Sequence, residues 1–422
     1  MRKLYGFSAV LVFLISFPLY SQWLPQTSGT TKALFNLAFF DVNTGIISGD
    51  SSTILKTSNG GNNWISLPPP GAGNNYYADV YMQNANNIYL AQGYSPGPGN
   101  GAILYSTNGG TSWTNQLTTQ YDMFSLSFIN STTGYAVGNG TGSSSTLYKT
   151  TNGSSWNPVS VSSIGFMTFI YFFTPTTGFI TSYNSSNILR STDAGLNWSV
   201  INTNSGQNQV SMVMMVDANN CYGIANAETF LKSTNGGVNW TSQSYGALEG
   251  LAIWFNSSST GFMVCGKGTP PEYKITRTTN AGVNWATVMS GTGKVYWCVK
   301  FISSLTGWIV GTGGSILKTT NGGTVWINRT GTGIPESYSL MQNYPNPFNP
   351  VTTIGYQLPV SDYVRLIIYD LNGRELKTFA DGEQQAGYYE IEWNASDYSS
   401  GVYFYKLQAG DYTESRKMIL SR

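Results

Sequence analysis

The sequence predicts an all-β fold class: a seven-bladed β-propeller followed by a small Ig-like β-sandwich. Three observations predict it. A motif that ends in tryptophan occurs seven times, at intervals of 49, 43, 42, 42, 45 and 41 residues, and a four-stranded propeller blade takes roughly 40–45 residues. Charged residues make up only 10% of the chain and aromatic residues 14%, which is typical of polar turns joining aromatic strands. The composition changes near Ile334, which indicates a second module.

The first 21 residues are expected to be a signal peptide rather than part of the fold. Arg2 and Lys3 form a charged start, Ala9 to Leu19 is a short apolar run, and Leu19-Tyr20-Ser21 is an acceptable cleavage site. The apolar run is too short to span a bilayer, so we expect no transmembrane segment after cleavage. The propeller is then expected over residues 22–333.

Each repeat is centred on a box such as STNGGVNW (233–240). Its third residue, Asn or Asp, can accept hydrogen bonds from backbone N–H groups two residues on, and Gly at the fifth position supplies a turn residue with positive φ. A strand precedes the box and the tryptophan starts the next strand, so each box is predicted to be a β-hairpin. The residues given this structural role are Asn59, Asn108, Asn152, Asp193, Asn235, Asn280 and Asn321, with Trp64, Trp113, Trp156, Trp198, Trp240, Trp285 and Trp326.

A second signature lies upstream of each box, as in FISSLTGWIVG (301–311), where an aromatic strand, a turn with Gly and a further strand follow one another. Each unit therefore holds four strands. Before the first unit, Trp23 to Thr27 resembles the strand that follows each box tryptophan. We expect this strand to pair with the last blade and close the ring, because an open ring leaves exposed strand edges. The last box also has an outer strand after Trp326, so the sequence leaves open which of the two completes the blade.

The boxes resemble the Asp-box (BNR) repeats of sialidases, sortilin-type receptors and related propellers. With the upstream signature included, residues 23–330 are similar to the photosystem II assembly factor family. This resemblance implies a sialidase-like propeller fold in which the boxes lie on outer hairpins, away from the ligand face. It does not carry a photosynthetic role to this chain, since unrelated proteins share the box.

The C-terminal module is expected to be a small sandwich of short strands over residues 341–422, after a linker at 334–340. A Pro-rich extended segment, YPNPFNP (344–350), opens it, and Asn372-Gly373 is a tight hairpin turn. Tyr389, Ile391 and Trp393 alternate with glutamates, which is the pattern of a half-buried strand.

This module closely resembles the type A C-terminal sorting domain of type IX secretion substrates. YPNPFNPVTTIGYQLP (344–359), VRLIIYDLNGREL (364–376), SGVYFYKL (400–407) and KMIL (417–420) carry the resemblance. It implies a Gram-negative bacterium, Sec export to the periplasm, and passage through the type IX machinery to the cell surface. Two points stay open: whether the tail is cleaved there, and whether the protein is released or attached to the cell surface. The resemblance assigns the sorting signal to Gly401, Tyr403, Lys417, Met418 and Ile419.

Composition excludes several kinds of chemistry. The chain has no histidine, which removes His general-base catalysis and His metal ligation. Cys221, Cys265 and Cys298 have no metal-site spacing and are expected to be small buried apolar residues. With a net charge of +1, the chain shows no sign of a nucleic-acid partner. We expect no metal and no cofactor.

The sequence offers little for a hydrolase. A sialidase needs three converging arginines, whereas Arg190 and Arg277 occupy the repeat position before the box, where other copies have lysine, and Arg329 lies on an outer strand. We expect the two repeat arginines to be solvated strand residues. Two carboxylates, Asp122 and Glu249, fall between blades and could face one rim. Two unrelated surface charges explain them more simply, so we expect a protein that is not an enzyme and has no catalytic residues.

Ligand binding is expected on the face opposite the boxes. There the loops between second and third strands vary in length, and variable loops on a rigid scaffold commonly carry binding. Aromatic side chains supply contact area at low entropic cost. The candidate ligand-face residues are Tyr76, Tyr77, Tyr94, Tyr121, Tyr183, Tyr245, Tyr273 and Trp297, and Tyr296 is expected in or near the core.

The sequence therefore predicts a secreted or cell-surface propeller that binds a glycan or protein, exported by the type IX secretion system. Two alternatives stay open: a carbohydrate-active hydrolase without a recognised motif, and a scaffold or assembly factor for an envelope complex.

Overall fold

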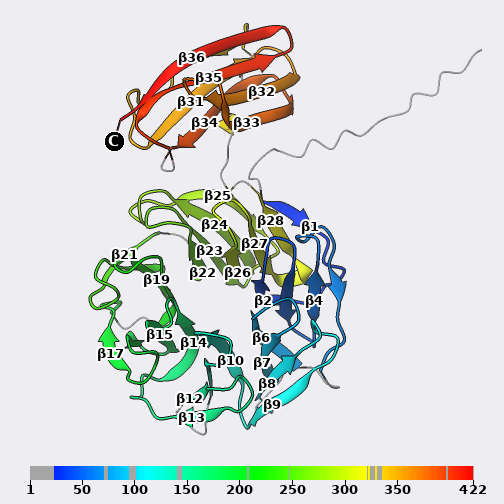
Figure 1. Ribbon diagram of the computed structural model, residues 1–422, viewed down its shortest axis with the longest axis vertical. Helices are drawn as coiled ribbons and strands as arrows, with labels where there is room; N and C mark the ends of the chain where they lie inside the picture. The colour runs from blue at the N-terminus through cyan, green and yellow to red at the C-terminus, as the bar shows by residue number, and fades with distance from the viewer. Residues whose placement is uncertain are drawn as a thin grey trace, which may run out of the picture. The chain divides into compact units, whose positions relative to one another are not determined.

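The computed structural model describes residues 23–70, 75–94, 101–139, 145–206, 209–246, 248–320, 322–323, 328–329, 335–395 and 398–421. The predicted signal peptide, Asn321 and Trp326 lie outside these residues. The chain divides into two compact units between Gly323 and Thr324. The first is a ring of four-stranded antiparallel sheets around a central axis, and the second is a smaller β-structure (Figure 1). Both units are all-β, as predicted.

Six blades of the first unit each contain four consecutive strands, ordered from the centre outward. Blade one contains β2 (Leu34–Phe39), β3 (Gly45–Gly49), β4 (Ile54–Thr57) and β5 (Ile65–Ser66). Blade two contains β6 (Asn75–Met82), β7 (Ile88–Tyr94), β8 (Gly101–Ser106) and β9 (Thr114–Thr119). Blade three contains β10 (Met123–Phe128), β11 (Gly134–Asn139), β12 (Ser145–Thr150) and β13 (Asn157–Val159). Blade four contains β14 (Phe166–Phe172), β15 (Gly178–Tyr183), β16 (Asn187–Ser191) and β17 (Ser199–Asn202). Blade five contains β18 (Val210–Met215), β19 (Cys221–Ala225), β20 (Thr229–Ser233) and β21 (Thr241–Ser244). Blade six contains β22 (Gly250–Phe255), β23 (Gly261–Gly268), β24 (Pro271–Thr278) and β25 (Ala286–Thr292).

The seventh blade joins the two ends of the propeller. It contains β26 (Tyr296–Phe301), β27 (Gly307–Gly311), β28 (Ile316–Thr319) and, outermost, the N-terminal β1 (Leu24–Gln26), with a short 3₁₀ turn η1 (Thr312–Gly314) before β28. β1 pairs antiparallel with β28, Leu24 opposite Lys318. The expected closure by the first strand is therefore confirmed. The outer strand that completes the seventh blade is β1.

Trp23 takes the place of a box tryptophan in this seventh blade. In blade one, a Cβ added to Gly61 of the box would meet the Trp64 indole at 3.3 Å; in blade seven, a Cβ on Gly323 would meet the Trp23 indole at 2.8 Å. Trp23 is only 2% exposed and packs edge-on against Phe262 and Phe301. Closure therefore buries a large aromatic side chain as well as pairing a strand.

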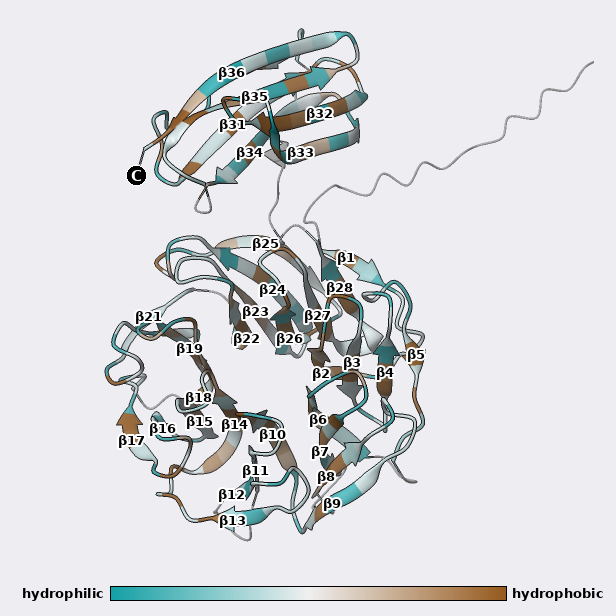
Figure 2. Ribbon diagram, viewed as in Figure 1, coloured by the Kyte–Doolittle hydropathy of each residue, from teal (hydrophilic) through white to brown (hydrophobic). Residues whose placement is uncertain are grey.

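The core lies between blades. The second strands are mostly buried, and β3, β19 and β27 are buried along their whole length. One cluster joins Ile46 and Ile54 of the first blade to Val80 and Leu90 of the second, and the apolar colouring in Figure 2 runs along these inner and middle strands. Because both faces of a blade are covered by its neighbours, the strands have near-continuous apolar runs instead of simple alternation.

The box hairpins of blades one to six form as predicted, with one correction. In the fifth blade the Asn235 side chain accepts from the Asn239 N–H at 2.9 Å, four residues on, whereas two residues on was expected. The first box residue was not assigned a role, yet the Ser233 hydroxyl accepts from the Gly237 N–H at 2.9 Å. The longer reach arises because the two residues after Asn235, Gly236 and Gly237, both have positive φ and extend the turn.

Each box turn is bonded to the turn after the inner strand of the same blade. The fourth box residue donates its N–H to that turn, as Gly60 does to the Asn43 carbonyl and Gly236 to the Asn219 carbonyl, both at 2.8 Å. These two turns therefore share one face of the propeller, as expected. The blade-to-blade connections and the starts of the inner strands lie at the opposite face.

The second unit is a two-sheet sandwich, as predicted. Its sheets are ordered β29-β34-β31-β30 and β33-β32-β35-β36 around one apolar cluster. Their strands are β29 (Asn328–Arg329), β30 (Ser339–Leu340), β31 (Val351–Leu358), β32 (Asp362–Tyr369), β33 (Glu375–Gln384), β34 (Gly387–Asn394), β35 (Gly401–Ala409) and β36 (Tyr412–Leu420). The predicted linker at 334–340 needs correction at its end, because β30 pairs with β31 and Leu340 is fully buried in the sandwich core.

The Pro-rich segment and the chain's last strand hold each other in place. Asn346 accepts a hydrogen bond from the Ile419 N–H at 2.9 Å, and Phe348 exchanges backbone bonds with Ile419 and Ser421. Met418 is fully buried and Lys417 is exposed. Two sequence features 70 residues apart thus form one structural unit.

Candidate functional site

A β-bulge interrupts every inner strand near its start, and the bulged side chains form a ring around the channel. In blade one the register shifts between Leu34 and Asn36, so Phe35 is the extra residue. A bulge redirects the side chain it carries. All seven bulged residues line one central cavity of about 510 Å³. They are Phe35, Ala78, Phe124, Thr168, Ser211, Leu251 and Trp297.

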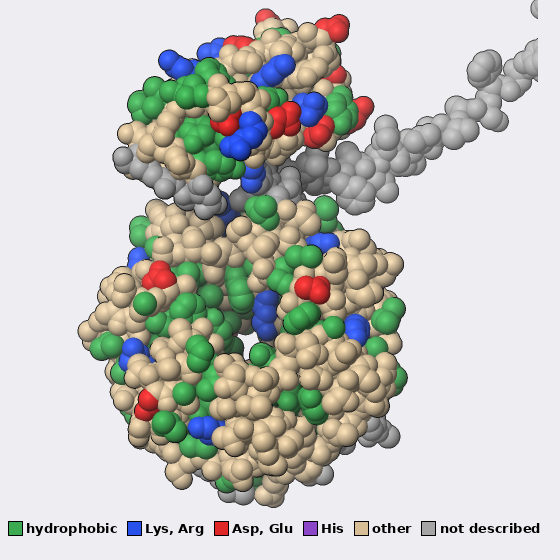
Figure 3. Space-filling view, viewed as in Figure 1, with side chains coloured by type: hydrophobic (Ala, Val, Ile, Leu, Met, Phe, Trp, Pro, Cys, Tyr) green, Lys and Arg blue, Asp and Glu red, His purple; other side chains and the backbone are tan. Residues whose placement is uncertain are grey.

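The lining below this bulge ring is mainly apolar and aromatic. It includes Phe169, Tyr171, Met212, Met214 and Trp254. The space-filling view shows the hollow at the centre of the propeller, on a face with few charged side chains (Figure 3). Within the described lining, Asp79 and Lys300 carry the charges.

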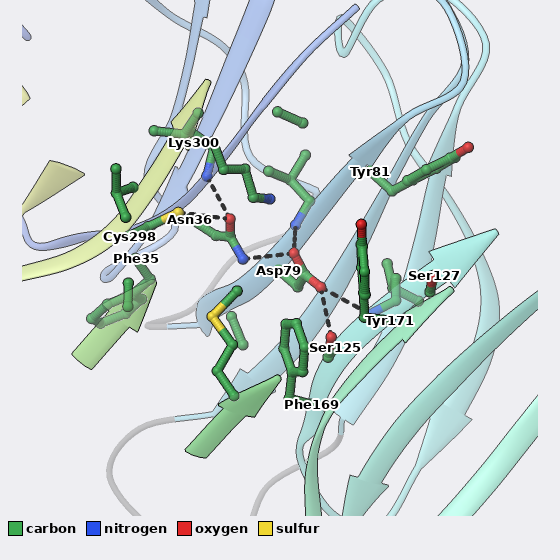
Figure 4. A pocket seen from close by; sticks show the side chains of 18 of the residues that line it. Phe35, Asn36, Asp79, Tyr81, Ser125, Ser127, Phe169, Tyr171, Cys298 and Lys300 are labelled. Carbon is green, nitrogen blue, oxygen red and sulfur yellow. Dashed lines mark hydrogen bonds between the residues drawn. The ribbon is translucent and has the colours of Figure 1, made fainter. Parts of the chain in front are cut away.

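Asp79 is a buried carboxylate that joins three blades. One oxygen accepts from the Asn36 side-chain amide at 2.7 Å and from its neighbour's N–H, that of Val80, at 2.8 Å. The other accepts from the Ser125 hydroxyl at 3.0 Å and the Leu126 N–H at 2.9 Å. Figure 4 shows Asp79 between Asn36 and Ser125. All four partners are donors, so the geometry fits the ionised form.

Burial and hydrogen bonding act on Asp79 in opposite directions. Burial raises the pKa of Asp79, and the nearby Lys300 charge together with the four donors opposes that rise. Lys300 is half-buried on β26 and points into the same channel (Figure 4). A charge of each sign therefore lies within an otherwise apolar cavity.

The polar network extends to blades on both sides. The Cys298 thiol donates to the Asn36 side-chain oxygen at 3.3 Å, and the Ile170 N–H donates to the Ser125 hydroxyl at 3.3 Å. The three cysteines are free and buried, as expected. Burial raises the pKa of the Cys298 thiol, so it is a poor nucleophile. The network ties blades seven, one, two, three and four around the channel.

Of the predicted ligand-face residues, Trp297 is the one in the bulge ring, with 37% of its surface exposed. Tyr76 lies on β6 of blade two and packs edge-on against Phe35 of the bulge ring, at 6.1 Å between ring centroids. Tyr121 and Tyr245 are half-buried at blade starts or ends, and Tyr183 is 50% exposed at the end of β15. The side chain of Tyr94 lies outside the described residues.

Two predicted ligand-face residues are core residues instead. Tyr77 is fully buried and Tyr273 is 7% exposed, each inside a cluster that joins neighbouring blades. Burial raises the pKa of Tyr77 to about 12. Each lies on a strand that the sequence reading had placed in a loop. Tyr296, 1% exposed, is in the core as expected.

The two candidate carboxylates occupy the same position in their blades, two residues before the bulge. Asp122 in blade three hydrogen-bonds the Tyr76 hydroxyl, and burial with this charge raises the pKa of Tyr76. Glu249 in blade six is exposed. They lie on blades three and six, with blades four and five between them on the shorter way round the ring, so the structure does not bring them together as a pair.

The expectation that the arginines at the repeat position are solvated is wrong for Arg190. Arg190 is not a solvated residue; its Nε donates to the Gly236 carbonyl of the next blade at 2.7 Å. Lys56 makes the equivalent bond to the Gly109 carbonyl at 2.9 Å, and burial lowers the pKa of Lys56. At these two copies of the repeat position, the basic side chain thus hydrogen-bonds its blade to the next one. The side chain of Arg329 lies outside the described residues.

The sequence reading missed the bulge ring, although the pattern contains a signal for it. The buried residues that flank the bulge are three apart, as Leu34 and Leu37 are, whereas a regular strand places them two apart. This spacing recurs in every blade, in Tyr77 and Val80 or Tyr296 and Val299 for example. Read across the repeats, it predicts two successive residues that face the channel.

Two further findings concern the described residues only. Within them, no group of three or more His, Cys, Asp or Glu side chains is arranged to hold a metal ion. They also contain no helix with the length and apolar character that crossing a membrane requires.

The C-terminal unit matches a known family. Residues 342–421 match the family described as "Secretion system C-terminal sorting domain". This unit is therefore a type IX sorting tail, which implies export and a cell-surface or secreted location. No curated protein matches the chain in a sequence search.

The propeller is similar to several solved structures. YCF48 bound to D1 peptide is 18% identical, with a TM-score of 0.59 over 72% of this chain and 98% of that one. YCF48 from Cyanidioschyzon merolae is 17% identical, with a TM-score of 0.57 over 71% and 98%. The WD40 propeller domain of Doa1 is 11% identical, with a TM-score of 0.56 over 72% and 97%. At such identities the likeness shows the fold, and it confirms the expected resemblance to photosystem II assembly factor propellers at that level.

Proposed function

We propose that this chain is a secreted binding protein whose propeller takes a protein segment into the mouth of the central channel. The single observation that carries the proposal is the bulge ring. Seven strands each turn one side chain toward the same opening, and Phe35, Phe124 and Trp297 supply aromatic surface there. A concave, mostly apolar site with a few polar groups is the usual form of a ligand site.

The lining favours a protein segment over a glycan. A sugar needs many hydrogen-bonding partners, whereas most of this lining is aliphatic, aromatic or methionine. The Asp79 oxygens are already occupied by four donors. Methionine and aromatic side chains suit apolar peptide side chains. A propeller of the same fold, YCF48, has been solved with a D1 peptide bound, which supports a peptide as ligand here.

The alternatives have weaker support. For a hydrolase, Asp122 is engaged by Tyr76, and Glu249 lies three blades away. An assembly role is compatible with a peptide-binding channel and with the likeness to YCF48, and it would use the same site. For export, we propose that the N-terminal segment directs the chain to the periplasm and the sorting tail directs it onward to the type IX machinery.

The proposal is tested by probing the full-length mature chain on a peptide array and on a glycan array. We expect selected peptides to bind and glycans to stay blank. Trp297→Ala should weaken peptide binding by about tenfold or more, since an aromatic anchor at the centre of a site contributes roughly 2 kcal/mol or more.

The matched control is Tyr183→Ala, which removes an exposed aromatic residue that does not line the channel. Its binding should equal that of the wild type. Glycan binding without peptide binding, or equal losses in the two variants, would contradict the proposal.

A further inference from the structure

We propose that the channel receives the end of a polypeptide, with the free C-terminal carboxylate of the ligand bound by the ammonium group of Lys300. This inference rests on the proposed function and specifies its ligand. It starts from the two charges in the channel. Asp79 is satisfied within the protein by four donors, so its oxygens have no acceptor site left for a ligand cation.

Lys300 differs from Asp79 in this respect. The described residues make no hydrogen bond or ion pair to its ammonium group within bonding distance, although Lys300 is close enough to influence the pKa of Asp79 and of Cys298. An ammonium has three donors. In a half-buried, largely apolar cavity, donors without acceptors favour a ligand that brings an anionic oxygen.

The depth of Lys300 favours a chain end over a side chain. Lys300 follows Trp297 by three positions on β26, and a strand advances about 3.3 Å per residue, so Lys300 lies on the order of 10 Å inside the bulge ring. An Asp or Glu side chain on the surface of a folded partner is too short to reach it. A peptide terminus can enter while its last side chains pack on the walls.

The walls beside Lys300 suit apolar terminal residues. Five of the six residues at the position equivalent to Lys300 in the other blades are apolar or aromatic; the six are Ala38, Tyr81, Ser127, Tyr171, Met214 and Trp254. We therefore expect a ligand whose final two or three residues are apolar or aromatic and whose carboxylate is free.

Matched peptides test the proposal. The probes are N-acetylated hexapeptides with apolar residues at the last three positions, each prepared with a C-terminal acid and with a C-terminal amide. Binding to the full-length mature chain is measured by titration calorimetry. We expect the acid to bind about tenfold or more tighter than the amide, the effect of one charge-assisted hydrogen bond in a partly desolvated site.

Variants of Lys300 locate the effect. Lys300→Met should remove the difference in affinity between acid and amide, and Lys300→Arg should retain it. Lys294→Met is the control, because Lys294 lies before β26 and outside this channel lining. If Lys300→Met does not fold, the affinities of the acid and amide peptides for the wild type still show whether a free carboxylate is bound.

The outcomes separate this inference from the proposed function. Equal binding of acid and amide to the wild type overturns the carboxylate site and leaves peptide binding intact. Absence of binding by every peptide overturns both. Binding of a uronic-acid oligosaccharide that depends on Lys300, without peptide binding, would show that the anion belongs to a glycan and would also overturn both.

Discussion

Asp79 shows how one buried residue can join the inner strands that surround the channel. Its carboxylate joins the inner strands of blades one, two and three, and Asn36 and Ser125 extend the network to blades seven and four. Such a group is costly to bury unless every acceptor is filled. The sequence analysis assigns Asp79 no role, because its partners in blades one and three are 43 and more residues away in the chain.

Replacing this carboxylate should destabilise the propeller. In Asp79→Asn, the amide nitrogen faces donors and leaves a buried N–H without an acceptor. We expect the free energy of unfolding to fall by about 2–4 kcal/mol, measured by urea denaturation. Asp50→Asn, whose carboxylate accepts from the adjacent Ser51 hydroxyl, is the control and should change it by less than about 0.5 kcal/mol. A loss at Asp79 no larger than at Asp50 would rule out the structural role.

At the scale of elements, the boxes made the blades predictable and the bulges did not. A box is a local feature: its Asn, its glycines and its tryptophan lie within eight residues. A bulge is a relation between two strands, visible only when the register of both is known. Tyr77 and Tyr273 were expected at the loop face, but β6 already begins at Asn75 and β24 at Pro271, so both residues lie within strands and pack between blades.

The closing strand gives a prediction at this scale. Trp23→Ala removes an indole that is 2% exposed, and the loss of such a core aromatic typically costs about 3–5 kcal/mol. We expect a lower melting temperature and faster proteolysis at the junction of blades six, seven and one. Leu24→Ala, at a neighbouring residue that is 62% exposed, should behave like the wild type. If both variants kept the wild-type melting temperature, Trp23 would not be what secures the ring.

For the whole molecule, the sequence predicted both units and their order, and the sorting tail supplied the location. It could not predict the candidate site in the channel, because the channel lining comes from seven segments spread over more than 250 residues. Among the seven proposed ligand-face residues whose side chains the structure describes, Trp297 alone lines the channel. The boxes, which reveal the fold, lie on the opposite face from the bulge ring.

We propose that the ligand binds inside the bulge ring. Hydroxyl-radical footprinting can show which side chains the ligand covers. The full-length mature chain is oxidised with and without a peptide selected on the array. We predict protection of Phe35, Phe124 and Trp297 in the complex, with no change at Tyr183 or at Leu196, an exposed residue of a box turn. Protection of Leu196 and the other box turns, with the bulge ring still reactive, would contradict the account.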